Sequence, residues 1–145
     1  MTWIDWPRML PEIPRGWTPR IIPLEDHERI ARRLEEIGFV VLHLTDPMKS
    51  ERDFHTAIAR LLEFPDYYGK NWDAFHDSVA DWARRDDQPT AILWSGWEDW
   101  LRSDLGGFLH TVAMLVEVNQ LPRETVIFMP GQCTWTFGNA LPKDR

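Results

Sequence analysis

Three aspartates spaced four residues apart form the most chemically specific feature of the chain. Asp73, Asp77 and Asp81 stand at i, i+4 and i+8, so in a helix their carboxylates lie on one face. Like charges at this spacing destabilise a helix by roughly a few tenths of a kcal/mol per pair. The helix dipole partly compensates an acid in the first turn, but not acids farther along. Folding does not require such a row, whereas a positively charged partner would be attracted by it.

A solvated helix face is the alternative interpretation of this acidic row. Arg84 and Arg85 follow Asp81 by three and four residues and could neutralise the last carboxylate. The neighbouring side chains favour a different interpretation, because aromatic residues beside charges are typical of protein-binding hot spots. These neighbours are two tyrosines, a histidine and a tryptophan: Tyr67, Tyr68, His76 and Trp82. The combination predicts a surface that binds another protein.

A turn followed by a helix must position these groups. Pro65 and Gly69 bracket the two tyrosines, and Gly69 can adopt a positive φ without a Cβ penalty. Asn71 is placed to cap the following helix, since its side-chain oxygen can accept an amide two or three residues on. From there the apolar residues recur with helical spacing and predict one buried stripe: Trp72, Phe75, Val79 and Trp82.

The segment DYYGKNWDAFHDSVADW, residues 66–82, resembles the central motif of the barstar family of intracellular ribonuclease inhibitors. Seven positions coincide with that motif: Tyr67, Tyr68, Gly69, Asn71, Asp73, Ala74 and Asp77. Trp82 matches an aromatic position, while the family has tryptophan in place of His76 and cysteine in place of Ser78. A looser resemblance extends from about Phe39 to Met129 through a matching order of elements.

The resemblance implies a fold and a function. The fold is an α/β three-stranded parallel sheet flanked by helices, here with an additional N-terminal helix. The function is inhibition of a basic ribonuclease or nuclease toxin, with Asp77 as the deepest contact and Asp73 as the second in a pocket that holds RNA phosphate. One of the two tyrosines would face the partner and the other the core, and Asn71 would cap the helix. A binding module of the same fold with a partner that is not a nuclease remains the alternative.

The order of patterns along the chain predicts one α/β domain at 24–145, preceded by a Pro/Trp-rich arm at 1–23. Five prolines exclude a helix or a central strand from the arm, and its three tryptophans favour an extended segment strapped across the domain over a disordered one. Helices are predicted over 24–38, from Ser50 and from Asp104 to about Asn119. Buried strands are predicted at 39–44, 90–94 and 125–129. Trp94, Trp97 and Trp100 are expected to pack over the core.

Composition limits the possible functions and locations. A net charge of −7 and the lack of a basic patch argue against direct nucleic-acid binding and suit a basic protein partner. The single cysteine, Cys133, excludes an internal disulfide, and neither a signal peptide nor a membrane-spanning run is found, so we expect a cytoplasmic protein that is a monomer when free.

Enzyme motifs are absent from the sequence. There is no Gly-rich phosphate loop, Cys-x-x-Cys pair, His-Glu-x-x-His pair or nucleophile elbow. The best local cluster consists of Asp73, His76 and Asp77, but hard-metal sites usually draw ligands from more than one element. We therefore expect no catalysis, no metal and no cofactor.

Overall fold

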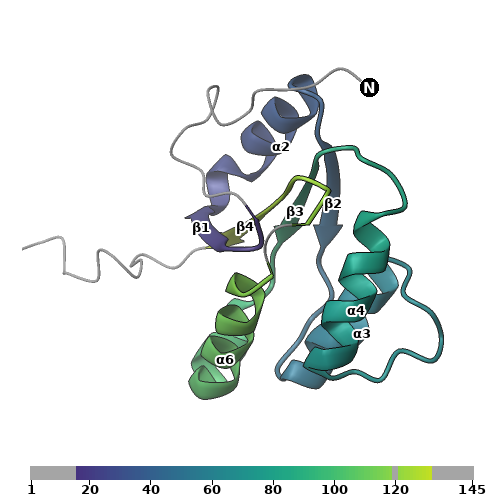
Figure 1. Cartoon of the computed structure of the whole chain (residues 1–145). Helices are drawn as coiled ribbons and strands as arrows, with labels where there is room; N and C mark the ends of the chain where they lie inside the picture. Colours follow the sequence, from purple (N-terminus) through teal and green to yellow (C-terminus); the bar gives the residue numbers. More distant parts are fainter. Residues whose placement is uncertain (1–15, 119–120, 132–145) are drawn as a thin grey trace, which may run out of the picture.

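The computed structural model describes residues 16–118 and 121–131, which form a parallel sheet covered by helices on both faces (Figure 1). Four strands lie in the order β1-β4-β3-β2, with bounds Pro19–Pro23 for β1, Val40–Leu44 for β2, Thr90–Trp94 for β3 and Thr125–Gly131 for β4. All three strand pairs are parallel. The predicted α/β class with a helix-flanked parallel sheet is confirmed.

Helices connect the strands and separate two apolar cores. A short 3-10 helix, η1 (Leu24–Asp26), leads into α2 (His27–Glu36), and Leu34 of α2 packs on one face of the sheet together with Ile37, the residue that follows the helix. On the opposite face lie α3 (Glu51–Leu61), α4 (Trp72–Ala83), α5 (Glu98–Ser103) and α6 (Leu105–Val116). Alternate residues of the central strands serve the two cores, as the two-residue period of a strand requires.

The number of strands differs from the prediction of three. Residues 19–23, which belong to the predicted arm, add an edge strand to β4, with Pro19 opposite Ile127. Two of the five residues are prolines, which lack the N–H that a central strand needs but are tolerated at an edge. The rest of the arm, residues 1–15, lies outside the described residues, as do Cys133 and the remainder of the 132–145 tail.

Burial separates the central strands from the edge strands. Every residue of β3 and β4 is buried, whereas β2 is half-buried over its first three residues and exposed at His43. The prediction of a buried strand at 39–44 was therefore wrong about burial, because β2 lies at the edge of the sheet. The side chains of Trp94, Trp97 and Trp100 are fully buried, which confirms that they pack in the core.

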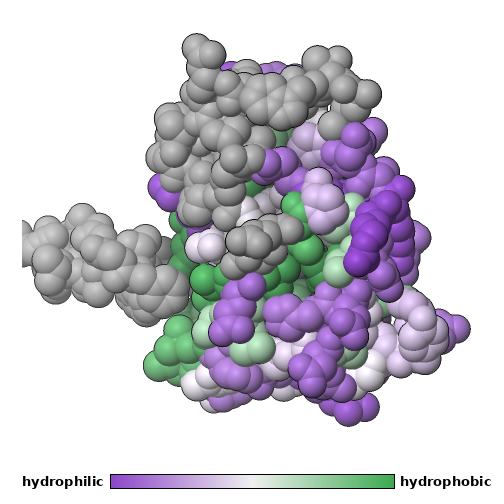
Figure 2. Space-filling view, viewed as in Figure 1, coloured by the Kyte–Doolittle hydropathy of each residue, from purple (hydrophilic) through white to green (hydrophobic). Residues whose placement is uncertain are grey.

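The α6 helix buries less of its apolar surface than its sequence suggests. The helical spacing predicts one apolar stripe of six residues, of which only Phe108 and Leu115 are fully buried: Leu105, Phe108, Leu109, Val112, Leu115 and Val116. Leu105, Leu109 and Val116 are 50%, 40% and 44% exposed, and Figure 2 shows a hydrophobic area over this helix. The sequence pattern could not distinguish the buried side of the stripe from the exposed one, because both are apolar.

Candidate protein-binding surface

The start of α4 is fixed by the predicted cap. Asn71 accepts a hydrogen bond from the Ala74 amide at 2.8 Å, and its side-chain amide donates to the Gly69 carbonyl at 3.3 Å. The expectation of a positive φ at Gly69 was wrong, because the left-handed residue of this turn is Lys70, with a φ of 54°. Glycine at position 69 leaves room for the cap, since a Cβ there would lie 3.0 Å from the Asn71 side-chain nitrogen.

One face of α4 is anchored in the core. Phe75 and Val79 are fully buried, Trp82 is 4% exposed, and Trp72 is half-buried. The Trp82 ring packs edge-on against Trp17 and lies beneath the Arg123 guanidinium at 4.0 Å. Trp82 was expected to contact a partner, but its burial places it in the core and away from any binding surface.

The opposite face of α4 carries the acidic row. Asp73, Asp77 and Asp81 are all exposed. Neither Asp73 nor Asp77 has an ion pair or hydrogen bond through its carboxylate with any residue in 16–118 or 121–131. Asp81 accepts a hydrogen bond from Arg84 at 3.1 Å, but both side chains are largely exposed, and surface pairs of this kind contribute little. Two unpaired carboxylates one turn apart therefore remain accessible to a partner.

Two arginines near α4, Arg85 and Arg123, are engaged with other groups. Arg85 donates to the carbonyls of Leu62 and Glu63, both at 2.9 Å, and so holds the loop at the end of α3. Arg123 is buried, stacks on Trp82 and donates to the Gln88 carbonyl at 3.1 Å. Both guanidinium groups thus hold the C-terminal end of α4, and neither pairs with an aspartate of the acidic row.

The two tyrosines of the turn point to opposite sides. Tyr67 is 87% exposed, whereas Tyr68 is 9% exposed, which fits the expectation that one faces outward and the other the core. The Tyr68 hydroxyl lies 2.5 Å from Nδ1 of the buried His55. Burial raises the pKa of Tyr68 and lowers the pKa of His55 to about 4 despite the nearby Glu51, so both groups are neutral at pH 7.

His76 lies between the acidic row and the core side of α4. It is half-buried, and its ring contacts that of Phe75 at a centroid distance of 6.2 Å. Its position next to Asp77 puts a polar aromatic ring at the margin of the acidic face.

Three residues that sequence reasoning missed hold the turn and α4 in place. Glu51 accepts hydrogen bonds from the Trp72 indole and from His110 Nδ1, both at 2.8 Å, so it links α3, α4 and α6. His55 packs beneath Trp72 with ring centroids 4.5 Å apart. Glu51 and His110 are 59 residues apart, and no local spacing could have revealed a contact of that range.

The acidic face of α4 is an exposed surface that another protein can contact. The described residues contain no group of three or more His, Cys, Asp or Glu side chains that could hold a metal ion, and this includes Asp73, His76 and Asp77. No described helix has the length and apolar character needed to cross a lipid bilayer. What the surface offers is a rigid helix with free carboxylates beside an exposed tyrosine.

Comparison with known protein families identifies this architecture. The family model described as barstar, the barnase inhibitor, matches residues 39–129, which is more than half of the chain. The chain belongs to the barstar family. A search of curated proteins found no match. The matched range runs from the residue before β2 to the middle of β4, and so it includes the turn and α4. The barstar-like segment recognised in the sequence thus coincides with the surface that carries the unpaired carboxylates.

Proposed function

We propose that this barstar-family protein inhibits a basic ribonuclease, and that it serves as the immunity partner of a nuclease toxin in the cytoplasm. The observation that carries the proposal is the pair Asp73 and Asp77, which are exposed on a helix anchored in the core and have no ion pair with a described residue. Family membership supports an inhibitor over an enzyme, since the family is described by its inhibition of barnase.

The mechanism that we propose is mimicry of RNA phosphate by carboxylates. A ribonuclease binds phosphate through arginine, lysine or histidine side chains, and a rigid pair of carboxylates can occupy the same positions. Buried interfacial charges contribute net affinity only if the partner's cations hydrogen-bond them fully. A helix already fixed by its cap and by Trp72 presents both acids without an ordering cost on binding.

Tyr67 and Asp81 are assigned supporting roles at this interface. Tyr67 supplies rigid aromatic area beside the acids, which lowers the entropy cost of contact. Asp81 adds negative potential and can exchange its surface pair with Arg84 for a partner's cation. Asn71 acts through the cap and Tyr68 through the core, so neither is assigned a direct contact.

The deciding experiment is capture followed by inhibition. The wild-type protein and the Asp73→Ala/Asp77→Ala variant are each immobilised and exposed to a lysate of the source cell. Captured proteins are identified, and RNA cleavage by each is measured with and without the free protein. We expect a basic ribonuclease that only the wild type captures and inhibits. A captured protein whose RNA cleavage is unaffected, or one without ribonuclease activity, would replace this proposal with the binding-module alternative.

A further inference from the structure

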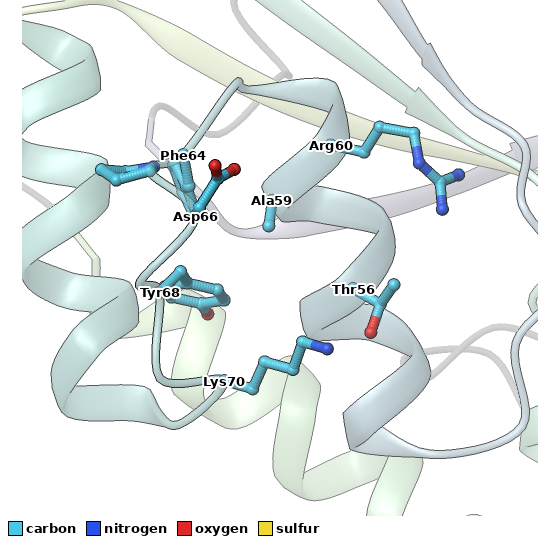
Figure 3. A pocket seen from close by; sticks show the side chains of 8 residues that line it. Thr56, Ala59, Arg60, Phe64, Asp66, Tyr68 and Lys70 are labelled. Atoms are coloured by element: carbon cyan, nitrogen blue, oxygen red, sulfur yellow. The ribbon is translucent and has the colours of Figure 1, made fainter.

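A pocket of about 210 Å³ lies beside the acidic helix, between α3 and the loop that carries Tyr67. Figure 3 shows that Thr56 and Arg60 reach it from α3, whereas Asp66, Tyr68 and Lys70 reach it from the loop. The same loop carries Tyr67 and leads directly into α4, so a partner that covers Tyr67 and the start of α4 would also lie close to Lys70.

Lys70 is a positively charged residue in an otherwise acidic segment, Phe64 to Trp82. Between Phe64 and Trp82 the chain has four aspartates and no other lysine or arginine. A surface selected only for a basic partner gains nothing from a cation at this place, because like charges across an interface are repelled. Lys70 therefore needs an explanation that the acidic row does not give.

The backbone and the neighbours of Lys70 leave its charge available. Its φ of 54° lies in the left-handed region, where a glycine or asparagine would fit with less strain. Its side chain extends along the pocket toward Thr56 rather than toward α4 (Figure 3). It forms no ion pair with any residue that the structure describes, although Asp66 lines the same pocket.

The other polar groups of the pocket are already engaged or lie at its far end. Arg60 forms an ion pair with Asp46. The Thr56 hydroxyl donates to the Arg52 carbonyl at 3.0 Å. Asp66 lies at the Phe64 end, away from the Lys70 ammonium (Figure 3). The Lys70 end of the pocket thus combines a cation that has no ion pair among the described residues with the aromatic side chain of Tyr68, a setting that fits a carboxylate on a short aliphatic stem.

From this geometry we infer that the partner places an aspartate or glutamate side chain in the pocket against Lys70. The inference rests on the proposed function and sharpens it: the ribonuclease has a basic active-site cleft with an acidic residue at its rim. Lys70 then acts as a specificity determinant, since a uniformly basic surface would match the acids of α4 but would clash with this lysine.

The direction in which a charge reversal at Lys70 changes the affinity tests the inference. The wild type, Lys70→Gln and Lys70→Glu are compared for affinity and association rate with the ribonuclease that the capture experiment identifies. We expect Lys70→Glu to weaken binding by at least about tenfold and Lys70→Gln by about threefold. If the partner were only basic here, Lys70→Glu would bind more tightly than the wild type. Equal or tighter binding of Lys70→Glu therefore overturns the inference.

Two controls separate the possible outcomes. Arg32→Glu makes the same change in net charge on α2, which lies on the other face of the sheet, and we expect it to leave affinity unchanged or slightly improved. Thermal unfolding checks that all variants fold equally, as glutamate and glutamine share the backbone strain of lysine at this position. If the wild type inhibits no ribonuclease, the proposed function and this inference fall together. If it does inhibit one but Lys70→Glu does not weaken binding, only the inference on Lys70 falls.

Discussion

Asp77 occupies the middle of the acidic row, with Asp73 one turn before it and Asp81 one turn after it. All three carboxylates are exposed, but among the described residues only Asp81 forms an ion pair, with Arg84. We therefore expect the three aspartates to contribute to binding by different amounts.

Replacing Asp77 by alanine should weaken ribonuclease binding without weakening the fold. We expect a loss of about 2 kcal/mol or more, roughly a 30-fold rise in Kd, because a hot-spot charge would leave the partner's cations unpaired. Asp73→Ala should cost less than Asp77→Ala, and Asp81→Ala least. Titration calorimetry measures the three affinities, and urea unfolding should show stabilities within about 0.5 kcal/mol of the wild type. A row in which Asp81→Ala costs the most would contradict the assigned order.

His55 makes the stability of the protein depend on pH. Its pKa of about 4 in the folded protein lies below the ordinary value of 6.5, chiefly because of burial. The unfolded chain therefore binds more protons between these values, and stability should be full above pH 6.5 and fall as the pH drops toward 4. The loss should total on the order of 2–3 kcal/mol.

Urea unfolding at pH 7, 6, 5 and 4.5 measures this dependence, with His55→Asn as the matched variant. Asparagine can keep a hydrogen bond to Tyr68 but does not titrate. The variant should be less stable at pH 7 and should lose less stability than the wild type on acidification. Parallel pH profiles for the two proteins would assign the acid sensitivity to other groups.

At the scale of elements, the turn before α4 depends on the Asn71 cap. Its side chain satisfies the Ala74 amide and closes back onto Gly69, so it fixes both the first turn of the helix and the direction of the loop. Asn71→Ala should lower the free energy of unfolding by about 1 kcal/mol, whereas Asn71→Ser should retain most of it because serine is also a good cap. Urea unfolding of both variants checks this, and equal losses would show that the side-chain acceptor is unimportant.

The elements that could be predicted from the sequence are those that depend on local patterns. The Ser50 and Asn71 caps, the apolar stripe of α4 and the buried strand at 90–94 follow from spacing within a few residues, and the structure has all of them. The fourth strand was missed, because an edge position that tolerates proline is decided by pairing with β4, over a hundred residues away. The burial of Trp82 was predicted from the stripe, but its contacts with Trp17 and Arg123, which are distant in sequence, were not.

The whole molecule is larger than its family-matched region. Residues 39–129 match the barstar model, but the core also contains residues that precede this range. Ile22 of β1, Leu34 of α2 and Ile37, which directly follows α2, contribute to the core on one face of the sheet. Trp17 completes the core on the other face, where α4 packs. The N-terminal segment from residue 16 onward is therefore part of the folding unit.

Trp17 is the residue on which this contribution can be measured. It is 1% exposed, and its ring packs edge-on against Phe75 at 5.8 Å and Trp82 at 6.1 Å, both on the buried face of α4. Trp17→Ala should destabilise the protein by about 3–5 kcal/mol, since it removes these contacts and leaves a cavity under the acidic helix.

Trp17→Phe is the control, and it should cost much less. Phenylalanine keeps most of the ring contacts and removes an indole N–H that is buried without a hydrogen-bond partner among the described residues. Urea unfolding measures both variants. If Trp17→Ala lowered the free energy of unfolding no more than Trp17→Phe, the segment before the family-matched region would contribute little to the stability of the core. If the order holds, α4 presents its carboxylates from a helix supported by residues on both sides of that region.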